Sequence, residues 1–299
     1  MTLNPDSLGK YIANQIRVSI DSIPNPIAEG IRIPLDDSNL SEFHQGNELV
    51  AKVQEAAANY SKLPEDLVSL LVDRSIALSL KLFSHDLAGI YVSALLLGKS
   101  IEKNPDYAKN PDVVNEFLRE ILKFKLLGLT GAYLASGGEQ SYEQRIPLSQ
   151  LEFLLDKVSR FQIVAVFGEG FIKSPEYAAL YQIVKNARGN AVVSYKEGGK
   201  WAKLSIQDNG TGILDEDGNP MPPERLHEIF GEFSTRKNGG LGLQVARRLM
   251  ELRRGDIEVV SSPIGSLAGE YSTLTGLSQV IDSPRFHGTK FTLYFPRTP

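Results

Sequence analysis

The chain of 299 residues contains no cysteine, one tryptophan and four histidines. Without cysteine it can form no disulfide and has no thiol for catalysis, which fits a reducing cytoplasm. No stretch approaches the ~18 consecutive apolar residues that a membrane helix needs. The first residues also lack the basic and apolar segments of a signal peptide. We therefore expect a cytoplasmic protein with no membrane insertion.

Charge and composition narrow the class of protein further. The net charge of −4 gives no reason to expect a nucleic-acid partner. Hydrophobic residues make up 42% of the chain and charged residues 23%, which is typical of a globular protein that buries a core. A chain of this length is expected to form about two domains.

The sequence pattern divides the chain into an N-terminal extension of unknown role (1–62), a helical region (63–140) and a mixed region (145–299). Within the extension, "SLGKYIANQIRVSI" has apolar residues at helical spacing. In the helical region we expect one helix over 63–103 and a second over 112–135. Between them lies "NPDYAKNPD", whose two Asn-Pro pairs end the first helix.

The first of these two helices carries an apolar seam in which steps of four and three residues alternate, as in a coiled coil. The seam consists of Ile76, Leu80, Phe83, Leu87, Ile90, Ala94, Leu97 and Ile101. If Leu80 is heptad position a, His85 falls at f, opposite the seam, and Asp86 at g, on its flank. The His85 imidazole should therefore face outward. Each helix has more apolar surface than one partner covers, so we expect a homodimer through residues 63–135, built as a four-helix bundle.

The mixed region alternates helices with strands. Strands are expected in "FQIVAVFG", "WAKLSIQDNGTG", "GDIEVVSS" and "TKFTLYFP", and helices in "PEYAALYQIVKNARGNAVVSY" and "LQVARRLMELRR". The late strands cluster toward antiparallel pairing. We therefore expect an α+β fold, in which the helical hairpin is followed by an α/β sandwich.

Two motifs of the mixed region have residue types that suit a nucleotide. In "NARGNA", Asn186 and Asn190 are four residues apart, which predicts one helical face. Amide oxygens there suit Mg2+ bridging phosphates. In "DNGTGI", Asp208 ends a strand, and Gly210 and Gly212 let the backbone turn against a ligand. A carboxylate at this point can accept a hydrogen bond from the amine of adenine.

Two further motifs follow in the same region. In "FGEFSTRKNGGLGL" the glycines lead into a helix start, where free N–H groups favour phosphate. The candidate ligands in this motif are Arg236, Lys237, Gly240, Leu241 and Gly242. In "HGTKFTLYF" a Gly-Thr turn at Thr289 enters the final strand. Each motif alone is a weak signal, because similar sequences occur in ordinary loops.

The order and spacing of the motifs resemble those of sensor histidine kinases of two-component systems. "FSHDL" is similar to the H box, "YQIVKNARGNAV" to the N box, "DNGTGI" to the G1 box, "IFGEFST" to the F box, "NGGLGL" to the G2 box and "HGTKF" to the last glycine box. The mixed region also resembles the ATPase fold shared by gyrase, Hsp90, histidine kinases and MutL. The resemblance covers about Leu63 to Pro296.

This resemblance implies a protein histidine kinase that uses ATP and Mg2+. His85 would be the phosphoacceptor, and Asp86 would act as base and hold the imidazole in position. Asn190 would bind the Mg2+. The partner would be the receiver domain of a separate response regulator, phosphorylated on an aspartate.

The sequence departs from the family pattern in five places. Ile90 stands where many members have proline, and Gly89 where threonine or asparagine often supports phosphatase activity. Val193 stands where a lysine often follows the N box, and Asn238 occupies the first G2 glycine. Residues 261–286 lengthen a connection that usually has a few residues, and insertions of this length are often functional or mobile.

Two other functions remain open from the sequence. A serine/threonine protein kinase of the same ATPase superfamily would keep the nucleotide motifs and need no histidine. A histidine phosphotransferase or scaffold dimer with a vestigial ATP domain would keep the His-Asp pair without proline after it. Acid lability of the phosphoprotein would separate the first from a histidine kinase, and a nucleotide-binding assay the second.

Overall fold

The computed structural model describes residues 5–21, 23, 51, 55, 58, 74–104, 106–107, 110–156, 158, 162–187, 189–231, 241–282 and 286–297. Contacts between residues divide the chain into two compact units, Met1–Gln144 and Arg145–Pro299. In the described residues, no helix is both long and apolar enough to cross a membrane.

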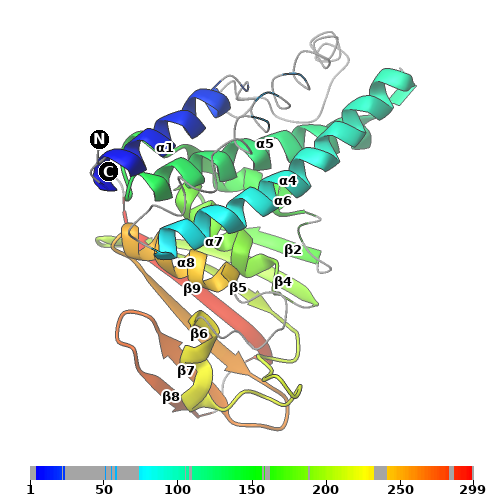
Figure 1. The fold of residues 1–299 in the computed structure, drawn as a ribbon. Coiled ribbons are helices and arrows are strands. Elements are labelled where there is room, and N and C mark those ends of the chain that lie inside the picture. The colour runs from blue at the N-terminus through cyan, green and yellow to red at the C-terminus, as the bar shows by residue number, and fades with distance from the viewer. Residues whose placement is uncertain are drawn as a thin grey trace. The chain divides into compact units, whose positions relative to one another are not determined.

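The first unit is helical, and its main feature is a hairpin of α4 (Arg74–Lys103) and α5 (Pro111–Ala135), which pack against each other (Figure 1). Four residues of the predicted α4 seam are at most 6% exposed: Leu80, Leu87, Ile90 and Ala94. Leu97 is half-buried. The side chains of Ile76, Phe83 and Ile101, and the predicted helical start at 63–73, lie outside the described residues.

The second helix of the hairpin begins and ends where the sequence provides caps. Pro111 is the first helical residue, and the Asn110 side chain accepts a hydrogen bond from the Asp112 N–H at 3.0 Å. This is the usual way an N-cap satisfies a helix N–H that has no partner in the first turn. At the other end, Gly138 adopts a positive φ of 95° and donates from N–H to the Tyr133 carbonyl, which closes the helix.

A further helix, α1 (Pro5–Asp21), packs on α5. Its buried stripe is at most 4% exposed and consists of Leu8, Ile12, Ala13, Ile16 and Ile20. The two helices approach closely at glycines. A Cβ on Gly9 would lie 2.3 Å from the Ala135 oxygen, and a Cβ on Gly128 would lie 2.4 Å from Ile20 Cδ1. The helical spacing read in this segment is therefore confirmed, and its apolar face covers α5. A short 3-10 turn, η3 (Gln140–Tyr142), follows α5.

The second unit contains a seven-stranded sheet with the order β2-β4-β5-β9-β6-β7-β8. Its strands are β2 (Gln162–Phe167), β4 (Asn190–Gly198), β5 (Trp201–Asp208), β6 (Asp256–Ser262), β7 (Ala268–Ser272), β8 (Ser278–Ile281) and β9 (Gly288–Pro296). The β2–β4 pair is parallel and the other pairs are antiparallel. A separate pair joins β1 (Arg145–Pro147) to β3 (Phe171–Lys173). The predicted α+β class and late antiparallel strands are confirmed.

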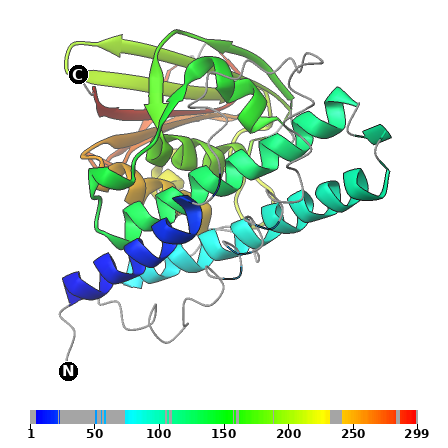
Figure 2. The same ribbon diagram turned by 90° about the horizontal axis from the view of Figure 1, so that it is seen from above.

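Helices α7 (Ser174–Val184) and α8 (Leu241–Leu252) pack together on one face of this sheet (Figures 1 and 2). Every residue of α7 is buried, whereas α8 buries one stripe. Shorter elements complete the unit: η4 (Leu148–Gln150), α6 (Leu151–Leu155) and η5 (Pro223–Phe230). The two long helices thus form the second layer of the sandwich.

One expectation about this unit is wrong, and one segment has structure that the sequence did not predict. The helix predicted over "PEYAALYQIVKNARGNAVVSY" ends at Val184, and the chain from Asn190 onward forms strand β4. Val193 is fully buried in that strand, so its side chain cannot serve a site on the surface. The long connection over 261–286 contains strands β7 and β8, which extend the sheet and pack on η5.

Candidate functional site

His85 lies near the middle of α4 and its side chain is 87% exposed. The outward orientation predicted from heptad position f is therefore confirmed. Its Nδ1 atom lies 3.8 Å from Asp86 Oδ1, which is an ion-pair distance and longer than a hydrogen bond. An exposed imidazole beside a carboxylate can act as a nucleophile once that carboxylate orients it.

Asp86 is more buried than its predicted flanking position implies, because its side chain is only 6% exposed. The g position adjoins the seam, and here the carboxylate lies on the inner side of the helix. The pair therefore combines one side chain in solvent with one held in the protein. A carboxylate whose position is fixed by burial can orient the neighbouring imidazole ring.

The neighbourhood of His85 on α4 is open and partly apolar. A Cβ added to Gly89 would meet no atom within 4 Å. Val92 is 50% exposed and Leu96 61%. The helix also continues through Ile90 to Lys103. Gly89, Val92 and Leu96 lie on successive turns of the same face of α4 as His85. We call this face the outer stripe of α4, and it presents apolar surface beside the histidine.

In the second unit, Asp208 forms a fixed corner at the end of β5. Its Oδ1 atom accepts hydrogen bonds from the Gly210 N–H at 3.0 Å and the Thr289 N–H at 2.8 Å. Asp208 is 8% exposed and Thr289 7%. The structure thus brings together three residues that the sequence assigned to the nucleotide, although 81 positions separate Asp208 from Thr289.

Glycines allow the backbone segments of this corner to approach one another. Gly288 has a φ of 115°, and a Cβ there would lie 2.2 Å from the Asp208 oxygen. Gly212 has a φ of 76° and lies against Ser261, whose hydroxyl accepts a hydrogen bond from the Ile213 N–H. Such positions favour glycine, because L side chains rarely adopt these angles.

The predicted helical face shared by Asn186 and Asn190 is not formed. Gly189 turns the chain with a φ of 74°, and the Asn209 side chain accepts a hydrogen bond from the Asn190 N–H at 2.8 Å. Asn190 therefore starts β4, one residue before Ala191, which pairs with Asp208 in the register of β4 and β5. A residue of the "DNG" motif, Asn209, was missed by the sequence reading. Its position directly after Asp208 was the available signal.

The residue one helical turn from Asn186 is Gln182, on α7. Asn186 Nδ2 donates to the main-chain oxygen of Gln182 at 3.0 Å. A Cβ on Gly242, at the start of α8, would lie 3.0 Å from Gln182 Oε1. Thus the end of α7 and the start of α8 meet at these amides, with Leu241 and Gly242 both half-buried. The spacing of four between Gln182 and Asn186 could have identified this pair.

Three predicted phosphate ligands, Arg236, Lys237 and Gly240, lie outside the described residues, as does Asn238. On either side of that segment, Gln244 of α8 donates a hydrogen bond to the main-chain oxygen of Gly231. The first turn of α8 is thereby tied to the residue that follows η5.

Comparisons with known proteins find similarity to kinases and related ATPases. Residues 176–299 match the family model "Histidine kinase-, DNA gyrase B-, and HSP90-like ATPase". The chain is 26% identical, over 286 residues, to the sensor histidine kinase YcbM of Bacillus subtilis (strain 168), covering 85% of each chain. The chain is thus similar to sensor histidine kinases.

Other similar proteins cover less of the chain or have a lower identity. The adaptive-response sensory kinase SasA of Prochlorococcus marinus (strain MIT 9313) is 32% identical over 93 residues, 27% of this chain and 25% of that protein. The catalytic domain of histidine kinase ThkA is 18% identical, covers 52% of this chain and 99% of its own, and has a TM-score of 0.35. The histidine kinase AdeS of Acinetobacter baumannii is 12% identical, covers 71% and 97%, and has a TM-score of 0.34.

The match of residues 176–299 to this ATPase family implies ATP use, and the residues present also suit Mg2+. Among the described residues, no group of three or more His, Cys, Asp or Glu side chains is placed to hold a metal. Mg2+ often binds through one or two protein oxygens together with substrate phosphates. The Asn186 amide fits that role, because its Nδ2 faces the Gln182 carbonyl and its Oδ1 is directed away from it.

Proposed function

We propose that the chain is an ATP-dependent protein histidine kinase that phosphorylates itself on His85. The phosphoryl group then passes to an aspartate in the receiver domain of a separate response regulator. The observation that carries this proposal is the exposed His85 side chain beside the buried Asp86 carboxylate, in a chain whose second unit belongs to an ATPase family.

In the first step, a ring nitrogen of His85 attacks the γ-phosphorus of ATP. A nitrogen–phosphorus bond forms, the bond to the bridging oxygen breaks, and ADP leaves with that electron pair. Asp86 stabilises the proton on the other ring nitrogen, so that the attacking nitrogen carries a lone pair. In the second step the aspartate oxygen of the response regulator attacks the same phosphorus, and the histidine leaves.

The nucleotide-binding unit supplies position and charge neutralisation, which dominate catalysis of phosphoryl transfer. We assign the adenine to the Asp208 corner with Thr289, Gly210 and Gly212. We assign Mg2+ to Asn186 rather than Asn190, because Asn190 lies in β4 beside Asn209. Bound Mg2+ would neutralise charge on the phosphates. The start of α8 would face the phosphates with Leu241 and Gly242, and Arg236, Lys237 and Gly240 would add to that site.

The proposed assembly is a homodimer through residues 63–135, in the cytoplasm and without nucleic acid. The supporting observation is the outer stripe of α4, where Val92 and Leu96 are exposed although the inner seam is already covered. Apolar residues at this spacing suit a second helix. The same helical face carries His85 one to three turns earlier, so the second helix would have to pack on the Leu96 end of the stripe and leave the histidine uncovered.

The experiment that tests the proposal uses labelled Mg-ATP and the whole chain. The protein should take up phosphate that is stable in alkali and labile in acid, as expected for phosphohistidine. His85→Gln should remove this label and leave ATP affinity unchanged, because nucleotide and acceptor lie on different units. His227→Gln is the matched control: His227 is an exposed residue of η5, and this variant should label normally.

Asp86→Asn tests the role of the carboxylate separately from that of the acceptor. The variant should bind ATP normally and phosphorylate itself roughly 10²–10⁴-fold more slowly, the usual effect of losing one acid–base group. The measurement is the initial labelling rate at saturating ATP. Acid-labile label on His85→Gln would overturn the assignment of the acceptor. Acid-stable label on wild type would favour the serine/threonine kinase, and failure to bind ATP in calorimetry would favour the vestigial scaffold.

A further inference from the structure

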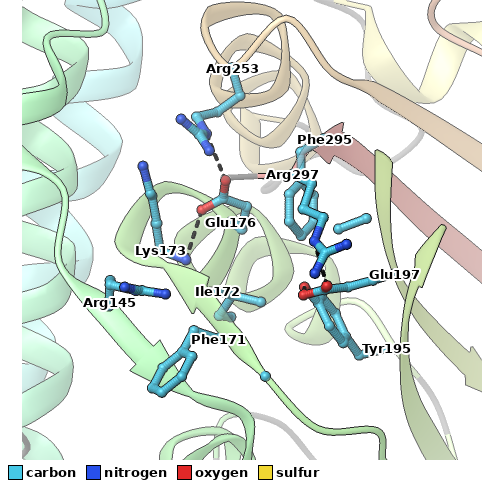
Figure 3. A pocket seen from close by; sticks show the side chains of 12 residues that line it. Arg145, Phe171, Ile172, Lys173, Glu176, Tyr195, Glu197, Arg253, Phe295 and Arg297 are labelled. Atoms are coloured by element: carbon cyan, nitrogen blue, oxygen red, sulfur yellow. Dashed lines mark hydrogen bonds and ion pairs between the residues drawn. The ribbon is translucent and has the colours of Figure 1, made fainter. Parts of the chain in front are cut away.

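A second candidate binding site lies in the nucleotide-binding unit, away from the residues assigned to ATP. It is a pocket of about 70 Å³ between the β1–β3 pair, the start of α7 and the ends of β9 and α8 (Figure 3). On this measure a single water needs only ~10–15 Å³, so the pocket has room for a small polar group. Its lining includes four cationic side chains, Arg145, Lys173, Arg253 and Arg297, against two carboxylates, Glu176 and Glu197.

One carboxylate forms the buried floor of the pocket. Glu176 is fully buried and its Oε1 atom accepts from Arg253 Nε at 2.6 Å, while its Oε2 atom accepts from the Lys173 N–H at 3.0 Å. Both carboxylate oxygens are therefore engaged by groups of the protein. A buried ion pair needs such additional hydrogen bonds to offset the loss of solvation. The floor is thus electrically balanced before any ligand enters.

The other carboxylate is engaged at the opposite wall. Glu197 Oε1 accepts from the Tyr195 hydroxyl at 2.7 Å, and Glu197 Oε2 lies 2.6 Å from Arg297 Nε. Burial and the neighbouring Glu197 charge raise the pKa of Tyr195, which keeps it a hydroxyl donor. The Arg297 side chain is 53% exposed, so it is at the mouth of the pocket rather than at its floor.

Arg145 faces these groups from the β1 side, where Figure 3 shows it across the pocket from Arg297. Its guanidinium stacks on the Phe171 ring, 4.8 Å from the centroid. Among the described residues, this guanidinium makes no ion pair and no hydrogen bond. Stacking uses the face of the guanidinium and leaves its N–H groups in the plane, where they match a carboxylate or phosphate.

We propose that this pocket binds a small oxyanion, the carboxylate or phosphate group of a metabolite, between Arg145 and Arg297. The positive side chains outnumber the carboxylates, and both carboxylates are already paired within the pocket. A ligand anion would therefore meet the in-plane N–H groups of Arg145 without displacing a partner. The site is distinct from the Mg2+ site assigned to Asn186, since it lies at the start of α7 whereas Asn186 follows the end of that helix, ~15 Å farther along at 1.5 Å per residue. The proposal does not depend on kinase activity.

The test is calorimetric titration of the whole chain with inorganic phosphate and, separately, with malonate. Binding of either anion is expected, and Arg145→Gln should raise its dissociation constant at least tenfold. Arg247→Gln is the matched control, because Arg247 is an arginine of α8 whose side chain is 40% exposed, pairs with Glu251 and does not line the pocket. The two anions show whether phosphate or carboxylate is preferred.

Glu197→Gln provides a test of opposite sign. Removing this charge releases Arg297 toward the pocket, so the anion should bind several-fold more tightly, whereas a residue of purely structural importance would not strengthen binding when changed. Absence of binding by both anions would overturn the proposal, as would binding that Arg145→Gln leaves intact. Unchanged affinity in Glu197→Gln would overturn the part assigned to Arg297.

Discussion

Replacing Gly288 by alanine should move the start of β9 away from Asp208 and so destabilise the protein. The φ of 115° at this residue costs an L side chain roughly 1–3 kcal/mol. The added Cβ would also lie 2.2 Å from the Asp208 main-chain oxygen and 2.8 Å from its Oδ1 atom. Because one of these contacts is with backbone, the strand ends must move, which adds about 1–3 kcal/mol. The unfolding free energy should fall by about 4 kcal/mol in total.

Urea unfolding followed by tryptophan fluorescence measures this loss, because the single tryptophan, Trp201, lies on β5 in the same unit. Gly276→Ala is the matched control. Gly276 also has a positive φ, of 66°, but a Cβ there meets no atom within 4 Å. It should lose only about 1–2 kcal/mol. Equal losses in the two variants would refute the close approach of Gly288 to Asp208. Gly288→Ala should also weaken ADP binding, because Asp208 loses its fixed position.

Three further changes have defined outcomes. Asn186→Asp should impair Mg-ATP binding, measured by calorimetry, and autophosphorylation, measured by labelling, whereas Asn190→Asp should retain most of both. Impairment by Asn190→Asp and not by Asn186→Asp would instead assign the metal to Asn190. Leu96→Lys should convert the proposed dimer to a folded monomer in sedimentation, and a stable dimer would place the interface elsewhere. Gly89→Ala should raise the unfolding free energy by roughly 0.5–1 kcal/mol, because the position is helical and open; a loss would show that its Cβ meets a partner.

Sequence patterns predicted those features of the fold that depend on local periodicity. The exposure of His85 follows from its place opposite a seam of period 3.5, and α5 (Pro111–Ala135) begins within one residue of the helix expected over 112–135. The burial of Asp86 was not predicted, because a g position can face either the flank or the seam depending on packing. The sandwich and its late antiparallel strands were predicted because the strands and helices that form them contain long apolar segments in the sequence.

The site was predicted less completely, since its geometry depends on contacts between distant residues. Asn190 was placed on a helix because the spacing from Asn186 is helical. In the structure, Gly189 and the side chain of Asn209, 19 residues away from Asn190, redirect the chain into a strand. Strands β7 and β8 were missed for a related reason. Gly269 packs against Pro223 of η5, and a contact of this kind leaves no periodic signal in a short segment.

The packing of α1 on α5 has a consequence for synthesis of the chain. About 90 residues separate Asp21 from Pro111, so at ~5–20 residues per second the ribosome needs roughly 5–20 s to supply the helix that covers α1. During that interval the stripe around Ile12 and Ile16 has no α5 to cover it, and a nascent chain of this kind is a natural client for a chaperone. Polar substitutions in that stripe should therefore reduce the yield of folded protein while leaving the nascent chain more soluble.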